Sequence, residues 1–267
     1  MQGKKKISPE ESSELGSLYF ELQASWGMTK HLGGLTATRQ LADLCHISKG
    51  KYVLVVGCGV GMTPCYLTKK YGCRAVGVDL SEMMVVRSKE RARREGVEDR
   101  LEFRVADAQS LSFEEAMFDA VICEPVNAFI PDKQRAINEY VRVTKTGGYV
   151  GFNEATWIKP PPPELAAYLT RIMGAEFLAG NGWKELLEGS GLRETAAIIY
   201  KTNALSQWIN EVRQFNLLEF LRAWYSFLFL FFKSSACRRF TKEALTFPRS
   251  IFSLFQYFGY GIYVGRK

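Results

Sequence analysis

Short apolar runs recur along the first two thirds of the chain, and each run is followed by a polar segment. The runs are rich in valine and do not alternate strictly with polar residues, which is typical of strands buried on both faces. They lie at Tyr52–Val56, Ala75–Val78, Leu101–Ala106, Ala120–Cys123 and Tyr149–Phe152, with helical periodicity clearest at Ser81–Glu95 and Lys133–Val143. Strands that alternate with helices predict an α/β fold, in which helices cover both faces of a mostly parallel sheet.

The pattern changes after the fifth run, where Lys159 is followed by four consecutive prolines. Because proline cannot continue a helix or a central strand, this segment is predicted to be an extended connector. Beyond it we expect helices at 164–177 and Gly182–Gly191, a strand at Glu194–Lys201, an aromatic-rich helical block at 203–256 and a closing strand at Gly259–Val264.

Length and composition predict one main domain with additions. The chain has 267 residues, of which 47% are hydrophobic, enough to bury one large core. No stretch approaches the roughly 18 uninterrupted apolar residues of a membrane span, and the lysine cluster within Met1–Ile7 lacks the apolar segment of a secretion signal. We therefore expect a cytoplasmic protein.

Six cysteines stand singly along the chain, and the sequence contains only two histidines. Without a CxxC pair or a cluster of histidines, the spacing predicts no metal site. We interpret the cysteines as reduced, mostly buried thiols.

The formal net charge of +7 comes from the end of the chain. Residues 213–267 contain nine Lys or Arg and two Glu, together with 16 of the 35 aromatic residues. Three interpretations stay open: the helices simply cap the sheet, they form a lid or tunnel for an apolar acceptor, or they contact an anionic membrane, here from its inner face. Nucleic acid is a disfavoured partner, because the rings form apolar clusters instead of alternating with polar residues.

Three glycines follow the first apolar run, at Gly57, Gly59 and Gly61. Glycines in such a turn let a ligand approach the main chain, and the following helix presents unpaired N–H groups. This arrangement favours a nucleotide or a carboxylate as the ligand. The spacing G-x-G-x-G differs from the G-x-G-x-x-G of dinucleotide-binding proteins, which argues against NAD.

Two aspartates follow the next two apolar runs. Asp79 comes directly after Ala75–Val78, and Asp107 comes directly after Leu101–Ala106. A carboxylate after the second strand can accept hydrogen bonds from ribose hydroxyls, and a carboxylate after the third can accept one from an adenine amino group. The sequence therefore predicts a ligand that contains adenosine.

These features occur within residues 50–155 as VLVVGCGVG, GVDLS, FRVADAQSLSF, FDAVICEPV and VTKTGGYVGFNE. In this order and spacing the sequence resembles the class I S-adenosylmethionine-dependent methyltransferases, of the broad group that includes ubiquinone, menaquinone, tocopherol, sterol and phosphoethanolamine methyltransferases. The resemblance implies a Rossmann-like sheet of seven strands whose seventh strand is antiparallel, with S-adenosylmethionine as cofactor and S-adenosylhomocysteine as product. We expect an N-terminal lid at 1–45, a core at 46–202 and 257–267, and a helical insertion at 203–256 between strands six and seven.

Carried over residue by residue, the resemblance assigns the methionine part of the cofactor to the glycine turn, the ribose to Asp79 and the adenine to Asp107 and its neighbours. The cofactor-binding set is then Gly57, Cys58, Gly59, Gly61, Asp79, Leu80, Asp107, Ala108, Gln109 and Glu124, with Glu124 at the floor of the methyl-transfer site. One departure is Val55, where the family carries an acid that helps fix the methionine amino group. The departure either weakens cofactor binding or transfers this role to another residue.

The first 40 residues resemble the aromatic, glycine-punctuated lid of the same family. Tyr19 and Trp26 are predicted to close over the cofactor or the acceptor, and His31 is a candidate general base. Glu154 and Trp157, which follow the fifth apolar run, are predicted to face the acceptor, and Glu124 is a second candidate catalytic residue.

Three functional hypotheses follow. The first is methyl transfer to a small, apolar or lipid-like acceptor by in-line displacement, which depends mainly on positioning. The second is an S-adenosylmethionine-binding sensor or scaffold at membranes without transferase activity, motivated by Val55 and by the lack of a clear base. The third is arsenite methylation, since Cys65 follows the glycine turn as in some arsenic methyltransferases; it requires Cys123 and Cys237 to converge with Cys65.

Overall fold

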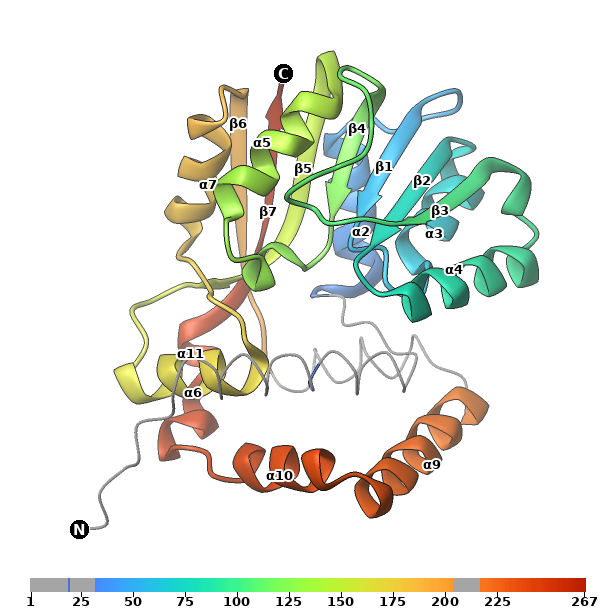
Figure 1. The fold of residues 1–267 in the computed structure, drawn as a ribbon. Coiled ribbons are helices and arrows are strands. Elements are labelled where there is room, and N and C mark those ends of the chain that lie inside the picture. Colours follow the sequence, from blue (N-terminus) through green and yellow to red (C-terminus); the bar gives the residue numbers. More distant parts are fainter. Residues whose placement is uncertain (1–18, 20–31, 204–216) are drawn as a thin grey trace.

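The centre of the molecule is a sheet of seven strands in the order β3-β2-β1-β4-β5-β7-β6. The structure, a computed structural model, describes residue 19, residues 32–203 and residues 217–267 of the chain. Figure 1 shows helices on both faces of the sheet and a row of further helices beyond one edge of it. The predicted α/β fold is confirmed.

Five strands form the parallel part of the sheet. They are β1 (Tyr52–Val56), β2 (Arg74–Asp79), β3 (Leu101–Val105), β4 (Phe118–Cys123) and β5 (Thr144–Trp157). Val55 of β1 is paired with Gly77 on one side and with Ile122 on the other. Because parallel strands end at the same edge, the segments that follow β1, β2, β3 and β4 emerge there together.

The remaining two strands complete the sheet in antiparallel fashion. The last strand, β7 (Phe258–Arg266), lies between β5 and β6 (Arg193–Lys201) and runs antiparallel to both, as predicted. β5 extends well beyond the predicted Tyr149–Phe152, because β7 pairs along it as far as Trp157.

Helices cover both faces of this sheet. α2 (Gly34–Leu44), α3 (Met62–Tyr71) and α4 (Glu82–Glu95) contribute to one buried cluster, and α5 (Lys133–Val143), α6 (Pro163–Met173) and α7 (Gly180–Gly189) contribute to the other. Short 3-10 helices lie at Glu98–Arg100 and Asn127–Phe129. α4 illustrates the local signals: the Ser81 hydroxyl accepts the Met84 N–H at 3.4 Å, and the helix ends at Gly96, whose φ is 67°.

The helices after the proline connector begin and end slightly earlier than predicted. α6 begins at Pro163, because proline is well suited to the first turn of a helix. It ends at Met173 instead of continuing to residue 177, since Gly174 adopts a left-handed φ of 66°. α7 begins at Gly180, two residues before the predicted start.

The predicted N-terminal lid at 1–45 includes α2, which packs on the sheet. α2 lies at the end of that segment and buries Ala37, Leu41 and Ala42 in the cluster that contains Val55. These residues recur at helical spacing and form an apolar face, which the sheet covers. Residues 34–44 therefore belong to the core, while 1–18 and 20–31 lie outside the described residues.

The predicted helical block at 203–256 is confirmed in its described part. We call residues 217–257 the helical arm: it contains α9 (Leu217–Lys233), α10 (Ser235–Ala244), a 3-10 helix (Arg249–Ser253) and α11 (Leu254–Tyr257), and it connects β6 to β7. Tyr168 and Arg171 of α6 join it to the rest of the molecule, since Arg171 Nη1 lies 2.7 Å from Glu243 Oε2. None of the described helices combines the length and the apolar content that a bilayer crossing requires.

Candidate functional site

The turn after β1 carries three glycines in the left-handed region, with φ of 65° at Gly57, 53° at Gly59 and 81° at Gly61. A Cβ on Gly57 would collide with the Val126 side chain, and a Cβ on Gly61 would lie 2.9 Å from the Ser88 Cα. The glycines are therefore required both by the backbone conformation and by close packing. At these three positions the turn has no side chain of its own, and the Val126 side chain packs against Gly57.

The Asp79 carboxylate fastens this turn to β2. Its Oδ2 accepts the Gly59 N–H at 2.9 Å, and its Oδ1 accepts the Ser81 N–H at 3.0 Å. The Cys58 N–H donates to the Val78 carbonyl at 2.9 Å, which ties the turn to the same strand. Burial raises the pKa of Asp79, and the backbone N–H groups of Ser81, Gly59 and Leu80 oppose that shift. Each oxygen keeps further acceptor capacity for a ligand.

The Asp107 carboxylate lies at the end of the neighbouring strand. Asp79 is paired with Val105, and the Ala106 N–H donates to the Asp79 carbonyl at 3.0 Å. Asp107 is exposed, and its Oδ1 accepts the Gln109 N–H at 2.8 Å. The structure thus brings the two predicted aspartates to adjacent strand ends.

The other predicted residues of this edge differ in exposure. Cys58 and Ala108 are buried, so their side chains are enclosed by the fold. Leu80, directly after Asp79, is three-quarters exposed. An exposed leucine beside two aspartates offers an apolar surface to a ring that the carboxylates would orient.

Glu124 follows β4 as a buried carboxylate beneath the glycine turn. Its Oε1 accepts the Thr38 hydroxyl of α2 and its Oε2 accepts the Thr63 hydroxyl of α3, each at 3.1 Å. Desolvation raises the pKa of Glu124 to about 7, while hydrogen bonds from Thr63, Thr38 and Asn153 oppose the rise. The carboxylate is held by three elements that are far apart in the sequence.

Glu124 also lies close to the position where the family acid is missing. Val55 pairs with Ile122 and Val56 with Cys123, so Gly57 and Glu124 directly follow the last pair of β1 and β4. Thr38 and Thr63, which donate to Glu124, belong to the helices that cover the face of the sheet containing Val55. The sequence predicted Glu124 but not Thr38 or Thr63. Both threonines are buried at core positions of helices, and a polar residue there is a signal that it has a buried partner.

Glu154 on β5 is fully buried. Its Oε1 accepts the N–H groups of Val126, at 2.7 Å, and of Asn127, and burial raises its pKa to about 8. Its Oε2 has no hydrogen-bond partner among the described residues. Glu154 thereby positions the loop after β4. Contact between Glu154 and an acceptor stays a prediction, and it would require this loop to move.

Aromatic side chains gather where β4 and β5 end. Trp157 makes edge-on contacts with Phe177 and Phe258, at centroid distances of 6.1 and 5.3 Å. Tyr19, from the N-terminal segment, stacks on Phe129 with centroids 6.1 Å apart. The predicted lid residues Trp26 and His31 lie outside the described residues.

All six cysteines are buried free thiols, as the sequence predicted. In the described residues, which include every cysteine, no three side chains of His, Cys, Asp or Glu come together in a way that could hold a metal ion. The convergence of Cys65, Cys123 and Cys237 that arsenite methylation requires is not formed.

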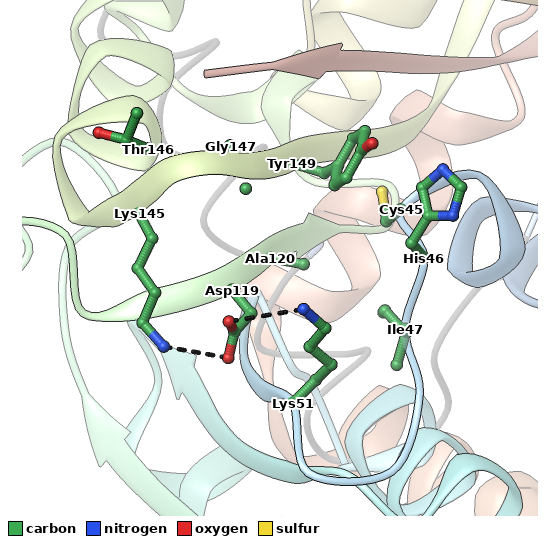
Figure 2. A pocket seen from close by; sticks show the side chains of 11 residues that line it. Cys45, His46, Ile47, Lys51, Asp119, Ala120, Lys145, Thr146, Gly147 and Tyr149 are labelled. Carbon is green, nitrogen blue, oxygen red and sulfur yellow. Dashed lines mark ion pairs between the residues drawn. The ribbon is translucent and has the colours of Figure 1, made fainter.

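A hollow of about 120 Å³ lies at the opposite, amino edge of the sheet. Figure 2 shows Lys51 and Lys145 directed at Asp119, with N–O distances of 3.7 and 3.2 Å. Asp119 also accepts the Tyr52 N–H at 2.8 Å, so this carboxylate fastens the beginnings of three strands. The residues that line this hollow include none of the predicted site residues, and we interpret the hollow as structural.

The fold and the carboxyl-edge site together define a class of protein. Residues 54–152, which include the glycine turn, both aspartates and Glu124, match the family model described as a methyltransferase domain. The match covers somewhat more than a third of the chain, and together with the relatives it supports the predicted resemblance to the class I S-adenosylmethionine-dependent methyltransferases.

Two curated relatives and one solved structure illustrate the similarity. Methyltransferase GfsG of Streptomyces halstedii is 35% identical over 115 residues, which cover 43% of this chain and 41% of GfsG. Phosphoethanolamine N-methyltransferase 1 of Zea mays is 28% identical over 165 residues, which cover 62% of this chain and 32% of the relative. The chain thus spans less than half the length of both relatives. The [4+2]-cyclase SpnF is similar in fold, with a TM-score of 0.74 at 20% identity and 96% of both chains covered.

Proposed function

We propose that the protein binds S-adenosylmethionine at the carboxyl edge of the sheet and transfers a methyl group to a small, apolar acceptor. The observation that carries this proposal is the Asp79 carboxylate, which accepts the Gly59 N–H at 2.9 Å. This bond fixes the distance between the glycine turn and the carboxylate. A cofactor that contains a nucleoside needs both groups, the turn for one end and the carboxylate for the ribose.

The residues at this edge fit the cofactor in shape and charge. The turn at Gly57 and Gly59 would receive the methionine part, because glycines let a ligand approach the main chain, and the Val126 side chain, which packs against Gly57, would line this approach. Asp79 would accept the ribose hydroxyls with the lone pairs that its backbone donors leave free. Leu80 and Asp107 would hold the adenine, Leu80 through its exposed apolar surface and Asp107 through its carboxylate.

In this proposal Glu124 supplies the negative charge that Val55 does not. It follows β4 directly, as Gly57 follows the paired strand β1, and it is oriented by the hydroxyls of Thr38 and Thr63. The raised pKa of about 7 gives it a mixed protonation state near neutral pH, and a nearby ammonium group would favour the ionised form. Glu124 is therefore assigned as a residue that positions the methionine part, and cofactor binding is expected to release protons.

Methyl transfer requires little covalent participation by the protein. When bound, S-adenosylmethionine supplies an electrophilic methyl group, so the chain has to hold the acceptor in line with it and exclude water. Two aromatic groups are suited to both tasks: Tyr19 stacked on Phe129, and Trp157 with Phe177 and Phe258. A base is needed only for an acceptor that loses a proton, and His31 stays the candidate from the sequence.

The aromatic groups at the ends of β4 and β5 favour an apolar acceptor. Proteins similar to this chain include one named for a polar acceptor, phosphoethanolamine, and one named for an apolar chain, geranyl diphosphate. Rings that already pack edge-on around Trp157 offer dispersion contacts to hydrocarbon and few hydrogen bonds. This chemistry suits a prenyl, quinone or other lipid-like molecule.

The test is methyl transfer by the full-length protein. We expect label from methyl-labelled S-adenosylmethionine to enter an organic-soluble extract when prenyl diphosphates, quinols or tocopherols are offered, and not when phosphoethanolamine is offered. Asp79→Asn should abolish most of the transfer, whereas Asp99→Asn, at a carboxylate that is 72% exposed outside the site, should not change it. Label confined to phosphoethanolamine would overturn the acceptor class, and calorimetry without detectable cofactor binding would overturn the whole proposal.

A second candidate function is binding without methyl transfer, as a sensor or scaffold at membranes. It is favoured by Val55 at the position of the family acid, and by the similarity in fold to a protein named as a [4+2]-cyclase. Cofactor binding by calorimetry together with no transfer to any acceptor, apolar or polar, would support this function in place of the first.

A further inference from the structure

The helical arm (217–257) contains a small core of its own. Cys237 of α10 is buried, and Phe227, Leu230 and Phe231 of α9 pack against it together with Phe240. Figure 1 shows α9 and α10 end to end in a row beyond the edge of the sheet where β1, β2 and β4 end. One face of α9 is therefore occupied by the contact with α10.

A second face of α9 is apolar and exposed. The large apolar residues of this face lie one and four positions apart in the sequence, which places them on one side of the helix. They are Trp224, 51% exposed, Tyr225, 71%, Leu228, 46%, Phe229, 46%, and Phe232, 75%. Large rings left in water forgo the free energy that burial would supply, so this face is not explained by folding.

Exposed cations border this aromatic face. Lys233 Nζ lies 4.5 Å from the centroid of the Phe229 ring, and Arg238 donates to the Phe231 and Phe232 carbonyls at 3.0 and 2.9 Å. The arm contains six Lys or Arg and two Glu, and one of those acids, Glu243, is paired with Arg171. Aromatic rings beside a surplus of cations complement a surface that is apolar inside and anionic outside.

The exposed apolar surface continues beyond α10. Leu245, Phe247 and Phe252 lie in the connection from α10 to α11, and Phe252 is 84% exposed. Arg249 in the same connection is also exposed. A second copy of this chain would bring like charges together, which disfavours self-association through this surface.

We propose that the exposed face of α9, with the cations of α10, docks the protein on the surface of a membrane that contains anionic phospholipid. α9 would lie along the interface, with its rings at the level of the acyl chains and its cations among the headgroups. The proposal does not depend on methyl transfer, so its failure would leave the proposed function intact.

The test is sedimentation of the full-length protein with vesicles. We use phosphatidylcholine alone and an equal mixture of phosphatidylcholine and phosphatidylglycerol, and we expect binding to the mixture that weakens as salt is added. Phe229→Ser with Phe232→Ser should weaken binding by about tenfold per ring, because each serine removes a ring from the acyl region. Lys233→Glu with Lys242→Glu should weaken binding to the mixture by about tenfold or more at low salt.

The matched control is Met83→Ser with Val86→Ser, two apolar residues of α4 that are about as exposed as Phe229. We expect this control to bind vesicles like the unaltered protein, and circular dichroism should show that all variants retain their helices. Absence of binding to the anionic vesicles, equal binding to both vesicle types, or an unchanged affinity in the double-serine variant of α9 would each overturn the proposal.

Discussion

The sheet domain buries large aromatic side chains, whereas the helical arm (217–257) leaves several of its own exposed. In the sheet domain Trp183 and Tyr140 are fully buried, and their polar atoms are satisfied: Trp183 Nε1 donates to the Ala155 carbonyl at 3.1 Å, and the Tyr140 hydroxyl to Asn127 Oδ1 at 2.9 Å. In the arm, Trp224 and Phe232 are more than half exposed. The first set of rings stabilises the fold, whereas the second set is available for contact with something outside the chain.

The largest expected effect separates two tryptophans that differ in burial. Trp183→Ala should lower the free energy of unfolding by about 3–5 kcal/mol, because it leaves a cavity among Phe152 and Tyr263. Trp224→Ala should lower it by about 1 kcal/mol or less, since the ring is half exposed and loses an edge-on contact with Phe227. Urea denaturation of both variants measures the difference, and losses of equal size would contradict the contrast between the regions.

The parts of the fold that could be predicted from the sequence depend on local patterns. β1 and β2 are short apolar runs flanked by glycines and a carboxylate, and each is decided within about ten residues of sequence. The full length of β5 could not be predicted, because it follows from pairing with β7, more than 100 residues later. α2 was assigned to the lid for a similar reason: an apolar helix face does not say which surface covers it.

In the candidate site, too, the local features could be predicted and the long-range contacts could not. Asp79, Asp107 and the glycine turn could be predicted, because strand ends of a parallel sheet meet at one edge whatever the rest of the chain does. The hydrogen bonds of Glu124 could not, since Thr38 and Thr63 are 86 and 61 residues away in sequence. Contacts of this kind depend on how the helices pack, and the spacing of residues within one segment does not predict that packing.

A second prediction concerns the pH dependence of the sheet domain. The pKa of Glu124 rises on folding from its ordinary 4.5 to about 7, so the folded chain binds more protons than the unfolded chain between these pH values. Stability should therefore fall as the pH rises through this window, by about 3 kcal/mol for this residue. Glu124→Gln should remove that part of the fall, which urea denaturation at pH 5 and pH 8 can measure.

Asp99→Asn is the control for this experiment, because it alters a carboxylate that is exposed to solvent. It should keep the pH dependence of the unaltered protein. Glu154 stays in both variants and contributes a fall of its own, since burial raises its pKa to about 8. If Glu124→Gln and the unaltered protein lose stability in parallel, the raised pKa of Glu124 is wrong.

A smaller effect compares the two aspartates of the cofactor edge. Asp79→Asn should weaken S-adenosylmethionine binding by about 100-fold, because it removes a charged acceptor that also holds the Gly59 N–H. Asp107→Asn should weaken it by about tenfold, since this exposed carboxylate already competes with water for its partners. Calorimetry measures both, and an equal loss in the two variants would mean that the Asp79 contact with the turn contributes nothing to binding.

The smallest effect concerns the joint between the two regions. Arg171 of α6 reaches Glu243 of the arm at 2.7 Å, and the Tyr168 hydroxyl donates to the Ala244 carbonyl beside it. Arg171→Met keeps most of the side-chain volume but removes the ion pair, which for a partly exposed pair amounts to about 0.5–1 kcal/mol. We expect faster hydrogen exchange in α9 and α10 with unchanged exchange in β1 and β4, because the sheet does not depend on this contact. Exchange that accelerates equally in the sheet and in the arm would show that the two regions unfold as one cooperative unit.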